Sequence, residues 1–310
     1  PLPFGAGESF PHSWTVHVLP GRGALDRSGL LRVLPGCDGL LCLLTDPIDR
    51  ALIDASSKLR IIANVGVGYN NIDWLHARER GIQVTNTPGA LTESTADLTF
   101  ALILATSRRI VEADRFLREG RFHGWDLELM LGLELCGATL GIVGMGRIGQ
   151  AVARRARAFG LEIIYHARHP LPPNSESVAG ATWRPLDELL RLSDVVSLHC
   201  PLTPDTRHLI DAEALALMKP EAILINTARG PVVDEAALVE ALRSGRLGGA
   251  GLDVFEEEPV VHPGLLELPN VVLLPHVGSA THRTRRAIVK MAVDNLRTFF
   301  TSGKPLNPVY

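Results

Sequence analysis

The sequence predicts an α/β protein made of two doubly wound, parallel-sheet domains with a cleft between them. Short apolar runs of strand length alternate with segments of helix length from Gly39 onward, and this alternation is typical of parallel β/α units. The chain has 310 residues, of which 46% are hydrophobic. That length favours two domains over one, each with an ordinary apolar core.

The first third of the chain predicts a short series of alternating elements. Residues 1–30 are rich in glycine and proline, and within them we expect only a short strand at 15–19. The next elements are expected as strand, helix, strand, helix and strand, at residues 39–44, 48–56, 59–65, 73–80 and 81–85. One long helix then begins at Thr92 and runs to about Gly120. Its first half is apolar on almost every side, which predicts burial.

The rest of the chain repeats the alternation more regularly. Strands are expected at residues 139–143, 162–166, 195–199, 222–226, 249–253 and 271–274. Helices are expected at 147–159, 186–192, 211–218 and 234–243, and an amphipathic helix at 281–301 could pack back on the first domain. We therefore predict one domain from residues 1–93 and 276–310 and a second from 94–275, with an arm at about 94–137.

Composition excludes several classes of function. The net charge is −3 and the pI is near 6.5, whereas a nucleic-acid partner favours a basic face. No apolar run reaches membrane-spanning length, and because the first residues lack a basic flank followed by an apolar run, we expect no signal peptide among them. Four cysteines form no C-x-x-C pair, and the histidine spacings resemble no metal site. We expect a cytoplasmic protein without a metal.

A glycine-rich turn lies between an expected strand and an expected helix. Gly144, Gly146 and Gly149 form G-x-G-x-x-G. In this arrangement the first glycine makes the tight turn, the second admits a pyrophosphate and the third lets the helix pack on the strand. The amides of Gly146, Arg147 and Ile148 would face the phosphates at the positive end of the helix. The turn predicts a Rossmann-like dinucleotide-binding domain.

The end of the next expected strand bears on the choice of nicotinamide cofactor. An NAD site usually carries an acidic residue about 20 residues after the turn, which binds the ribose 2′-hydroxyl. Residues 165–169 read Y-H-A-R-H and contain no acid. A guanidinium attracts the 2′-phosphate of NADP, so Arg168 favours NADP, with His169 as a second candidate. Alternatively, Arg168 is a solvated surface charge and the protein binds NAD without the usual acid.

Three further segments follow expected strands directly, where open α/β sheets bind their ligands. Residues 226–230 read N-T-A-R-G, residues 251–259 read G-L-D-V-F-E-E-E-P, and residues 274–279 read L-P-H-V-G-S. Histidine transfers protons near neutral pH and arginine binds carboxylates, so these segments are candidates for acid–base chemistry on an acid.

Over about residues 37–310 the chain resembles the D-2-hydroxyacid dehydrogenases, and within them the glyoxylate/hydroxypyruvate reductases. The resemblance depends on these three segments and the glycine turn, and also on residues 64–73 (N-V-G-V-G-Y-N-N-I-D), 86–89 (N-T-P-G), 92–97 and 200–203 (C-P-L-T). It implies a catalytic set of Arg229, Glu258 and His276. His276 would donate a proton to the carbonyl oxygen, Glu258 would orient the ring, and Arg229 would bind the substrate carboxylate. Glu256 and Glu257 are alternatives to Glu258 by composition alone.

The resemblance also implies the remaining binding residues. The loop at Val67 and Gly68 would hold the substrate carboxylate, since a glycine-flanked loop can aim successive amides at an anion. Besides the glycine turn and Arg168, cofactor contacts are implied at a set of residues near strand ends: Thr95, Ala167, His169, Cys200, Pro201, Thr206, Thr227, Ala228, Asp253 and Gly278. The implied activity is NADPH-dependent reduction of glyoxylate or hydroxypyruvate to glycolate or D-glycerate.

The chain departs from the family pattern at two places. Residues 1–5 look like the segment after the family's first strand, so either the first sheet lacks an edge strand or the chain begins after it. Leu129 stands where glyoxylate reductases carry a tryptophan, which affects the shape of the substrate pocket. The arm at residues 125–136 resembles a dimerisation element. Another NAD(P)-dependent D-2-hydroxyacid dehydrogenase, or a nucleotide-sensing corepressor-like binding protein, are the alternative functions.

Overall fold

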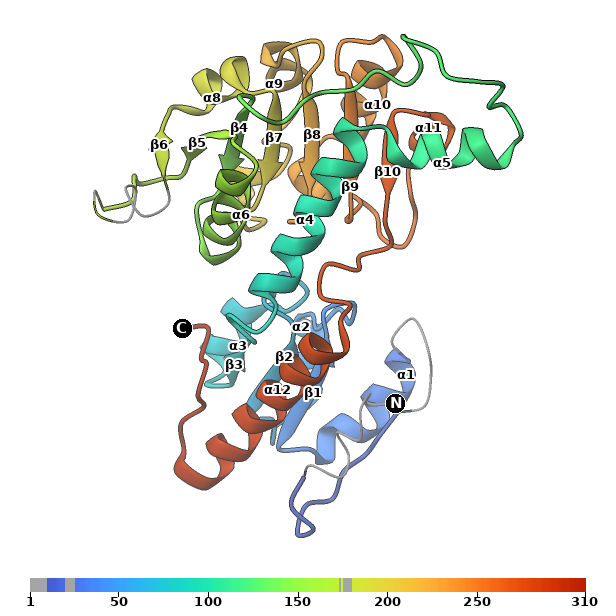
Figure 1. Cartoon of the computed structure of the whole chain (residues 1–310). Helices are drawn as coiled ribbons and strands as arrows, with labels where there is room; N and C mark the ends of the chain where they lie inside the picture. Colours follow the sequence, from blue (N-terminus) through green and yellow to red (C-terminus); the bar gives the residue numbers. More distant parts are fainter. Residues whose placement is uncertain (1–9, 20–25, 173, 175–179) are drawn as a thin grey trace. The chain divides into compact units, whose positions relative to one another are not determined.

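The structure is a computed structural model that describes residues 10–19, 26–172, 174 and 180–310 (Figure 1). It divides into two compact units. Unit 1 comprises Pro1–Leu91 and Ser279–Tyr310, and unit 2 comprises Thr92–Gly278. Each unit contains a parallel sheet, which confirms the predicted α/β class. No helix among the described residues is both long and apolar enough to cross a bilayer.

Unit 1 is built on a parallel sheet in the order β1-β2-β3. The strands are β1 (Gly39–Leu43), β2 (Ile61–Val65) and β3 (Gln83–Thr85), and the helices are α1 (Arg27–Val33), η2 (Leu34–Gly36), α2 (Arg50–Asp54), α3 (Trp74–Glu79) and α12 (His282–Ser302). β2 is buried along its whole length. The later turns of α12 pack on the start of β2 and its earlier turns pack on Val65, so α12 runs antiparallel to β2. The first turn of α12 therefore lies at the carboxyl end of that strand.

Unit 2 contains a parallel sheet in the order β10-β9-β8-β7-β4-β5-β6. Its strands are β4 (Thr139–Val143), β5 (Glu162–His166), β6 (Ala181–Trp183), β7 (Val195–Leu198), β8 (Ile223–Asn226), β9 (Gly249–Leu252) and β10 (Val271–Leu273). β4 lies between β5 and β7, so the strand order reverses at β4. Such a switch point is where doubly wound sheets bind their ligands.

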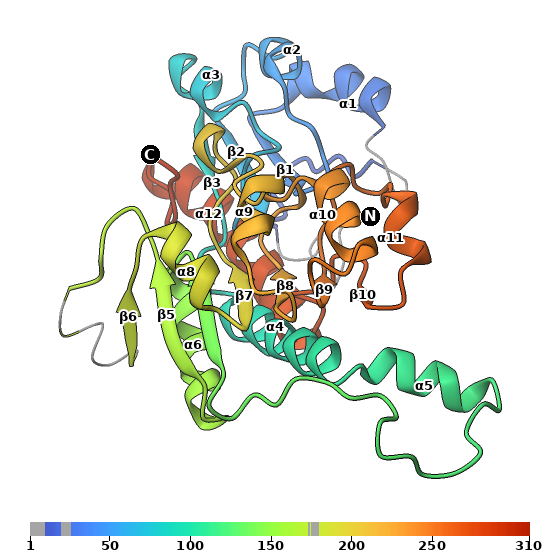
Figure 2. The same ribbon diagram turned by 90° about the horizontal axis from the view of Figure 1, so that it is seen from above.

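Helices cover both faces of this sheet (Figure 2). One face packs on α4 (Thr92–Ser107) and α6 (Arg147–Ala158) through an apolar cluster that includes Ile142 and Ile225. The other face packs on α8 (Leu186–Leu192), α9 (Ala212–Leu217) and α10 (Glu235–Arg243) through a second cluster. The remaining short elements are η3 (Pro204–Thr206), η4 (Gly230–Val232) and α11 (Pro263–Glu267).

The prediction of one helix from Thr92 to about Gly120 was wrong. The chain leaves α4 at Ser107, and α5 (Ile110–Arg118) begins only after Arg109 adopts a left-handed conformation with φ 50°. The returning arm occupies the space in which α4 would have continued. Leu133 donates its N–H to the Ser107 carbonyl at 2.8 Å, and a Cβ on Gly132 would lie 2.2 Å from that same oxygen. The arm therefore caps α4. The chain then changes direction, and the helix that follows, α5, has no buried residue.

Other expected elements form with ends within two residues of the prediction. The expected strand at residues 15–19 does not form, because this stretch is irregular. Among the described residues, α1, β6, α11 and the three-residue helices η2, η3 and η4 were not predicted. α1 lies next to a glycine- and proline-rich stretch, β6 (A-T-W) is not a continuous apolar run, and α11 (P-G-L-L-E) combines proline and glycine in one short turn, so none of them shows a clear pattern.

Candidate active site

The glycine turn follows β4 directly and opens α6. Gly144 has φ 99°, and a Cβ there would lie 2.5 Å from the backbone nitrogen of Cys200. A Cβ on Gly149 would lie 2.3 Å from the Gly144 carbonyl oxygen. These two glycines are therefore required by the protein's own backbone, one for a conformation that favours glycine and both for close approach.

Gly146 needs a different explanation. Its φ of −77° suits any residue, and it is the N-cap of α6 without a side-chain cap. A Cβ built on it would meet no atom of the protein within 4 Å. Among the described residues, the N–H groups of Gly146, Arg147 and Ile148 donate to no protein acceptor. The bare backbone and free amides at a helix N-terminus fit the pyrophosphate of a dinucleotide.

The end of β5 lies beside this turn, because Gly144 donates its N–H to the His166 carbonyl at 2.8 Å. Arg168 and His169, which follow, are exposed. Within the described part of the chain no carboxylate forms an ion pair with Arg168. Among the described residues, therefore, no acid neutralises this guanidinium next to the turn or would repel a 2′-phosphate.

The predicted cofactor residues near β7 lie next to the turn but differ in how accessible they are. Cys200 is buried, and this burial raises the pKa of its thiol to about 11. The Thr206 hydroxyl donates to the Pro201 carbonyl at 2.7 Å and accepts from the Thr203 N–H at 2.8 Å. Thr206 therefore shapes its own loop. His199, which sequence reasoning missed, is half-buried beside Gly144, and desolvation of its ring lowers its pKa to about 3.

A second group of predicted cofactor residues is held together by hydrogen bonds. The Thr95 hydroxyl donates to the Gly278 carbonyl at 3.3 Å, and the hydroxyls of Thr99 and Thr227 lie 2.8 Å apart. Ala228, next to Thr227, donates its N–H to the side chain of Asn226 at 3.0 Å. These contacts join the start of α4 to the segments that follow β8 and β10.

Asp253 organises the loop that carries His276. Its two carboxylate oxygens accept the N–H groups of Val277 and Gly278 at 2.7 and 2.8 Å. Its carbonyl accepts the N–H of His276 at 2.9 Å. Burial raises the pKa of Asp253, and the two N–H donors act in the opposite direction. The expected contact of Asp253 with the nicotinamide stays a prediction, since both oxygens already have protein partners.

The three catalytic candidates follow β8, β9 and β10, at the same edge of one sheet. The His276 ring contacts Glu258 through Nδ1 at 2.8 Å from Oε2. The other oxygen of Glu258 accepts the N–H of Phe255 at 3.1 Å. Asn226, another residue without a predicted role, donates its side-chain amide to the Arg229 carbonyl at 3.0 Å. Asn226 is the last residue of β8, and an Asn whose side chain bonds nearby backbone is a known turn signal.

The charges of these groups are coupled. Burial would raise the pKa of Glu258, but the His276 ring, with smaller contributions from the Phe255 N–H and the Arg229 guanidinium, outweighs it and holds that pKa below its usual value. Burial lowers the pKa of Arg229, and Glu258 acts in the opposite direction. A carboxylate that stays ionised between a histidine and an arginine can orient the ring and stabilise its charged form.

The alternatives to Glu258 have other surroundings. One oxygen of Glu256 contacts the His208 ring at 2.5 Å and Arg207 at 3.3 Å. Its N–H donates to Glu235 at 2.6 Å. Glu257 is exposed. Of the three consecutive acids, Glu258 is the one whose carboxylate contacts the His276 ring.

The predicted substrate loop follows β2 in unit 1. Asn64 donates its side-chain amide to the Gly68 carbonyl at 2.7 Å, and Asn86 donates to the Val67 carbonyl at 2.7 Å. Their carbonyls are thus satisfied, whereas the N–H groups of Val67 and Gly68 donate to no acceptor in the described residues. Two amides left open by a loop of this kind can bind a carboxylate.

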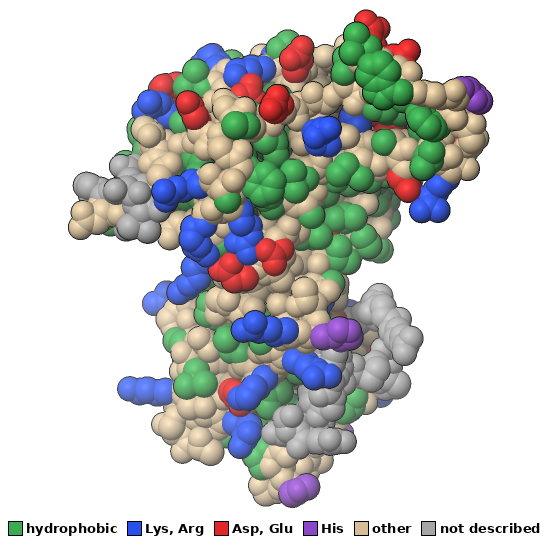
Figure 3. Space-filling model, viewed as in Figure 1, with side chains coloured by type: hydrophobic (Ala, Val, Ile, Leu, Met, Phe, Trp, Pro, Cys, Tyr) green, Lys and Arg blue, Asp and Glu red, His purple; other side chains and the backbone are tan. Residues whose placement is uncertain are grey.

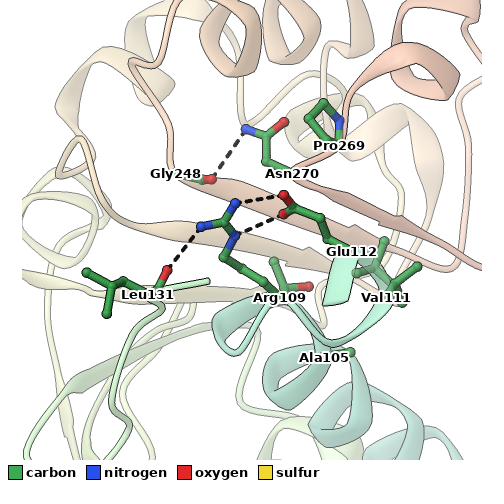
Figure 4. Close-up of a pocket in the computed structure, with 10 residues that line it drawn as sticks. Ala105, Arg109, Val111, Glu112, Leu131, Gly248, Pro269 and Asn270 are labelled. Atoms are coloured by element: carbon green, nitrogen blue, oxygen red, sulfur yellow. Dashed lines mark hydrogen bonds and ion pairs between the residues drawn. The ribbon is translucent and has the colours of Figure 1, made fainter. Parts of the chain in front are cut away.

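A hollow of about 290 Å³ lies elsewhere in unit 2. It is lined by residues that precede β9 and β10, among them Gly248 and Asn270, and by the turn between α4 and α5. Figure 4 shows Arg109 and Glu112 paired at this hollow, at 2.7 and 2.9 Å. Because its lining residues precede β9 and β10, the hollow lies at the amino ends of these strands, opposite the edge that carries His276.

No group of three or more His, Cys, Asp or Glu side chains suited to a metal occurs in the described ranges.

Comparisons with known proteins identify the family of this chain. Residues 100–278 match the family model described as "D-isomer specific 2-hydroxyacid dehydrogenase, NAD binding domain". A glyoxylate reductase of Thermococcus litoralis is 50% identical over 300 residues, which are 96% of this chain and 89% of that protein. The solved glyoxylate reductase of Paecilomyes thermophila has a TM-score of 0.86 at 41% identity and covers 93% of this chain and 89% of its own.

A second solved structure was determined with ligands. The NADPH-dependent glyoxylate/hydroxypyruvate reductase of Sinorhizobium meliloti, in complex with NADP and malonate, has a TM-score of 0.83 at 42% identity. The similarity covers 89% of this chain and 85% of that one. The fold and the site define an oxidoreductase with a nicotinamide-dinucleotide domain. The chain belongs to the D-isomer specific 2-hydroxyacid dehydrogenase family.

Proposed function

We propose that this protein reduces a small 2-oxo acid, glyoxylate or hydroxypyruvate, with NADPH, to give glycolate or D-glycerate. The observation that carries the proposal is the His276–Glu258 contact of 2.8 Å, electrostatically coupled to Arg229, at the edge of the sheet that also carries the glycine turn. The names of the relatives, glyoxylate reductase and glyoxylate/hydroxypyruvate reductase, support the choice of substrate.

In this proposal each residue has one task. His276 donates a proton to the carbonyl oxygen, and Glu258 orients the ring and favours its charged form. Arg229 pairs with the carboxylate and polarises the carbonyl, and the amides of Val67 and Gly68 are also proposed to bind the carboxylate. The chemistry that the cofactor supplies when bound is hydride transfer to C2. One hydride and one proton thus convert the 2-oxo acid to the 2-hydroxy acid.

The preference for NADPH over NADH is part of the proposal. Arg168 supports it, because its guanidinium is exposed beside the glycine turn and no acid stands at the end of β5. The bound NADP of the Sinorhizobium meliloti relative also supports it. The two-domain assignment, with residues 94–275 as the cofactor domain, belongs to the same proposal. All four cysteines are free, which suits the expected cytoplasmic location.

The test is an assay of NADPH and NADH oxidation with a panel of 2-oxo acids. We expect turnover with glyoxylate and hydroxypyruvate and a higher kcat/KM with NADPH. Replacing His276 by Asn should lower kcat by about 10²- to 10⁴-fold, with little change in the Kd of NADPH. Tight binding of a dinucleotide without turnover of any 2-oxo acid would contradict the proposal and favour a nucleotide-sensing protein.

A further inference from the structure

The loop that carries Arg168 is fastened at both of its ends. At its start, Trp183 donates its Nε1–H to the Ala167 carbonyl at 3.1 Å. At its end, Leu171 donates its N–H to the Tyr165 hydroxyl at 2.6 Å. Tyr165 is fully buried and lies opposite Trp183 in the register of β5 and β6. Two aromatic side chains on neighbouring strands thus fix the backbone of residues 167–171.

Between these two hydrogen bonds, the side chains of the loop are accessible to a ligand. Arg168 and His169 are exposed, and the ion pairs of the described residues do not include Arg168. Pro170 fixes its own φ and restricts His169 to extended conformations. The loop is therefore a short, pre-set backbone that presents one guanidinium.

The position of this loop is also fixed relative to the glycine turn. The His166 carbonyl accepts the Gly144 N–H at 2.8 Å, and the His166 ring packs near Trp183 with ring centroids 6.2 Å apart. The His166 Nδ1 lies 3.1 Å from the Arg184 carbonyl. Trp183 and the residue after it, Arg184, thus hold the strand end from which Arg168 projects.

We propose that Trp183 and Tyr165 are positioning residues for the recognition of the 2′-phosphate of NADPH. By holding residues 167–171 in one conformation, they let Arg168 meet the phosphate without first ordering its loop. Pre-ordering of this kind increases affinity because less conformational entropy is lost on binding. The proposal rests on the proposed use of NADPH and on the role assigned to Arg168.

A role in stability alone would have a different signature. Both side chains also contribute to the apolar cluster between the sheet and α6, so their loss could weaken the whole domain. A merely structural role would change the affinity for phosphorylated and unphosphorylated nucleotides equally. Positioning of Arg168 affects only the nucleotide that carries a 2′-phosphate.

The experiment uses Trp183→Phe and Tyr165→Phe, which keep an aromatic ring and remove one hydrogen-bonding group each. Titration calorimetry on the full chain measures the Kd of adenosine 2′,5′-bisphosphate and of 5′-AMP. We expect each variant to bind the bisphosphate about three- to tenfold more weakly, the effect of one lost hydrogen bond, and to bind 5′-AMP as before. Trp74→Phe, the same chemical change at a ring without a hydrogen bond on its nitrogen among the described contacts, is the control.

Combining Trp183→Phe with Arg168→Ala tests the positioning role of Trp183 separately from the role of Arg168 itself. If Trp183 acts through Arg168, Trp183→Phe should have no further effect on bisphosphate affinity in the Arg168→Ala background. An undiminished effect there, or equal losses for both nucleotides, overturns the positioning role while leaving the use of NADPH intact. If Arg168→Ala itself leaves the ratio of the two Kd values unchanged, the assignment of Arg168 fails, and the positioning role with it.

Discussion

His276 adopts a left-handed backbone conformation, with φ 53°, although it is not glycine. Such a conformation costs about 1–2 kcal/mol, and here Asp253 offsets it through three hydrogen bonds to consecutive N–H groups. The ring is thus aimed by the backbone as well as by Glu258. The sequence predicted both side chains through the family resemblance, but it could not reveal the role of Asp253 as an organiser of the loop.

Glu258→Gln should lower kcat/KM by about 10²-fold or more. A neutral amide can orient the His276 ring, but it does not stabilise the positive charge of that ring. Glu257→Gln, the matched change at the adjacent exposed acid, should leave kcat/KM unchanged. Steady-state assays of both variants check this. Equal losses in the two variants would show that the charge of the loop, and not the contact with His276, is what matters.

The lowered pKa of Glu258 also predicts how the stability of the fold depends on pH. A carboxyl whose pKa is lower in the folded state stabilises the fold above its ordinary pKa of about 4.3, and this stabilisation is lost as pH falls through the folded-state pKa. The difference in unfolding free energy between the wild type and Glu258→Gln should therefore shrink below about pH 4. Urea denaturation from pH 7 to pH 3 measures it, and a constant difference would contradict the shift.

Among the secondary-structure elements, the strands of unit 2 were the most predictable, and the physical reason is burial. β4, β7, β8 and β9 are almost entirely buried, so each reads as a continuous apolar run with polar residues just past its end. β6 could not be found this way, because its sequence A-T-W is not an apolar run, whereas the equally short edge strand β10 reads V-V-L. The role proposed for Trp183 was invisible for the same reason.

The junction of α4 and α5 shows where periodicity fails. Residues 92–118 are compatible with one helix, and the break at Arg109 depends on contacts with the arm more than twenty residues later, where Arg109 donates to the Leu131 carbonyl at 3.4 Å. A single sequence does not reveal such a long-range contact. The helical pattern was real, and tertiary contacts interrupted it.

This junction can be tested with two substitutions. Arg109→Ala and Arg109→Gly both remove the ion pair with Glu112, but only glycine relieves the left-handed backbone. We expect the glycine variant to be more stable than the alanine variant by about 1 kcal/mol. Urea unfolding of both proteins gives the comparison. An alanine variant of equal or greater stability would mean that the conformation at residue 109 stores no strain.

For the molecule as a whole, the proposed reaction gives no role to the exposed surface of α5 and the arm. α5 has no buried residue, and large apolar side chains of α5 and the arm are exposed, including Leu117 at 61%, Trp125 at 83% and Leu127 at 75%. Figure 3 shows hydrophobic side chains on the surface over this segment. Exposed apolar area of this kind marks an interaction surface. Together with the family resemblance, it supports the proposal that the protein forms a homodimer through the arm.

We predict that Leu117→Asp combined with Leu127→Asp converts a dimer to a monomer, because a dimer interface would bury two uncompensated charges per subunit. Light scattering after size-exclusion chromatography measures the mass. Leu266→Asp on α11, at a side chain that is 65% exposed, is the control and should leave the mass unchanged. A wild-type protein that is monomeric at micromolar concentration would contradict the proposal at once.

All three catalytic candidates, and the glycine turn with them, belong to the single stretch Thr92–Gly278, whereas the loop proposed to hold the substrate belongs to the other unit. In the proposed function, the proton donor and the cofactor site therefore belong to one unit, which also supplies Arg229 to the substrate carboxylate, and the other unit supplies the amides of Val67 and Gly68. Substitutions around Gly66 and Gly68 are therefore expected to change the affinity for the acid while the residues proposed to donate the proton and to hold the cofactor stay intact.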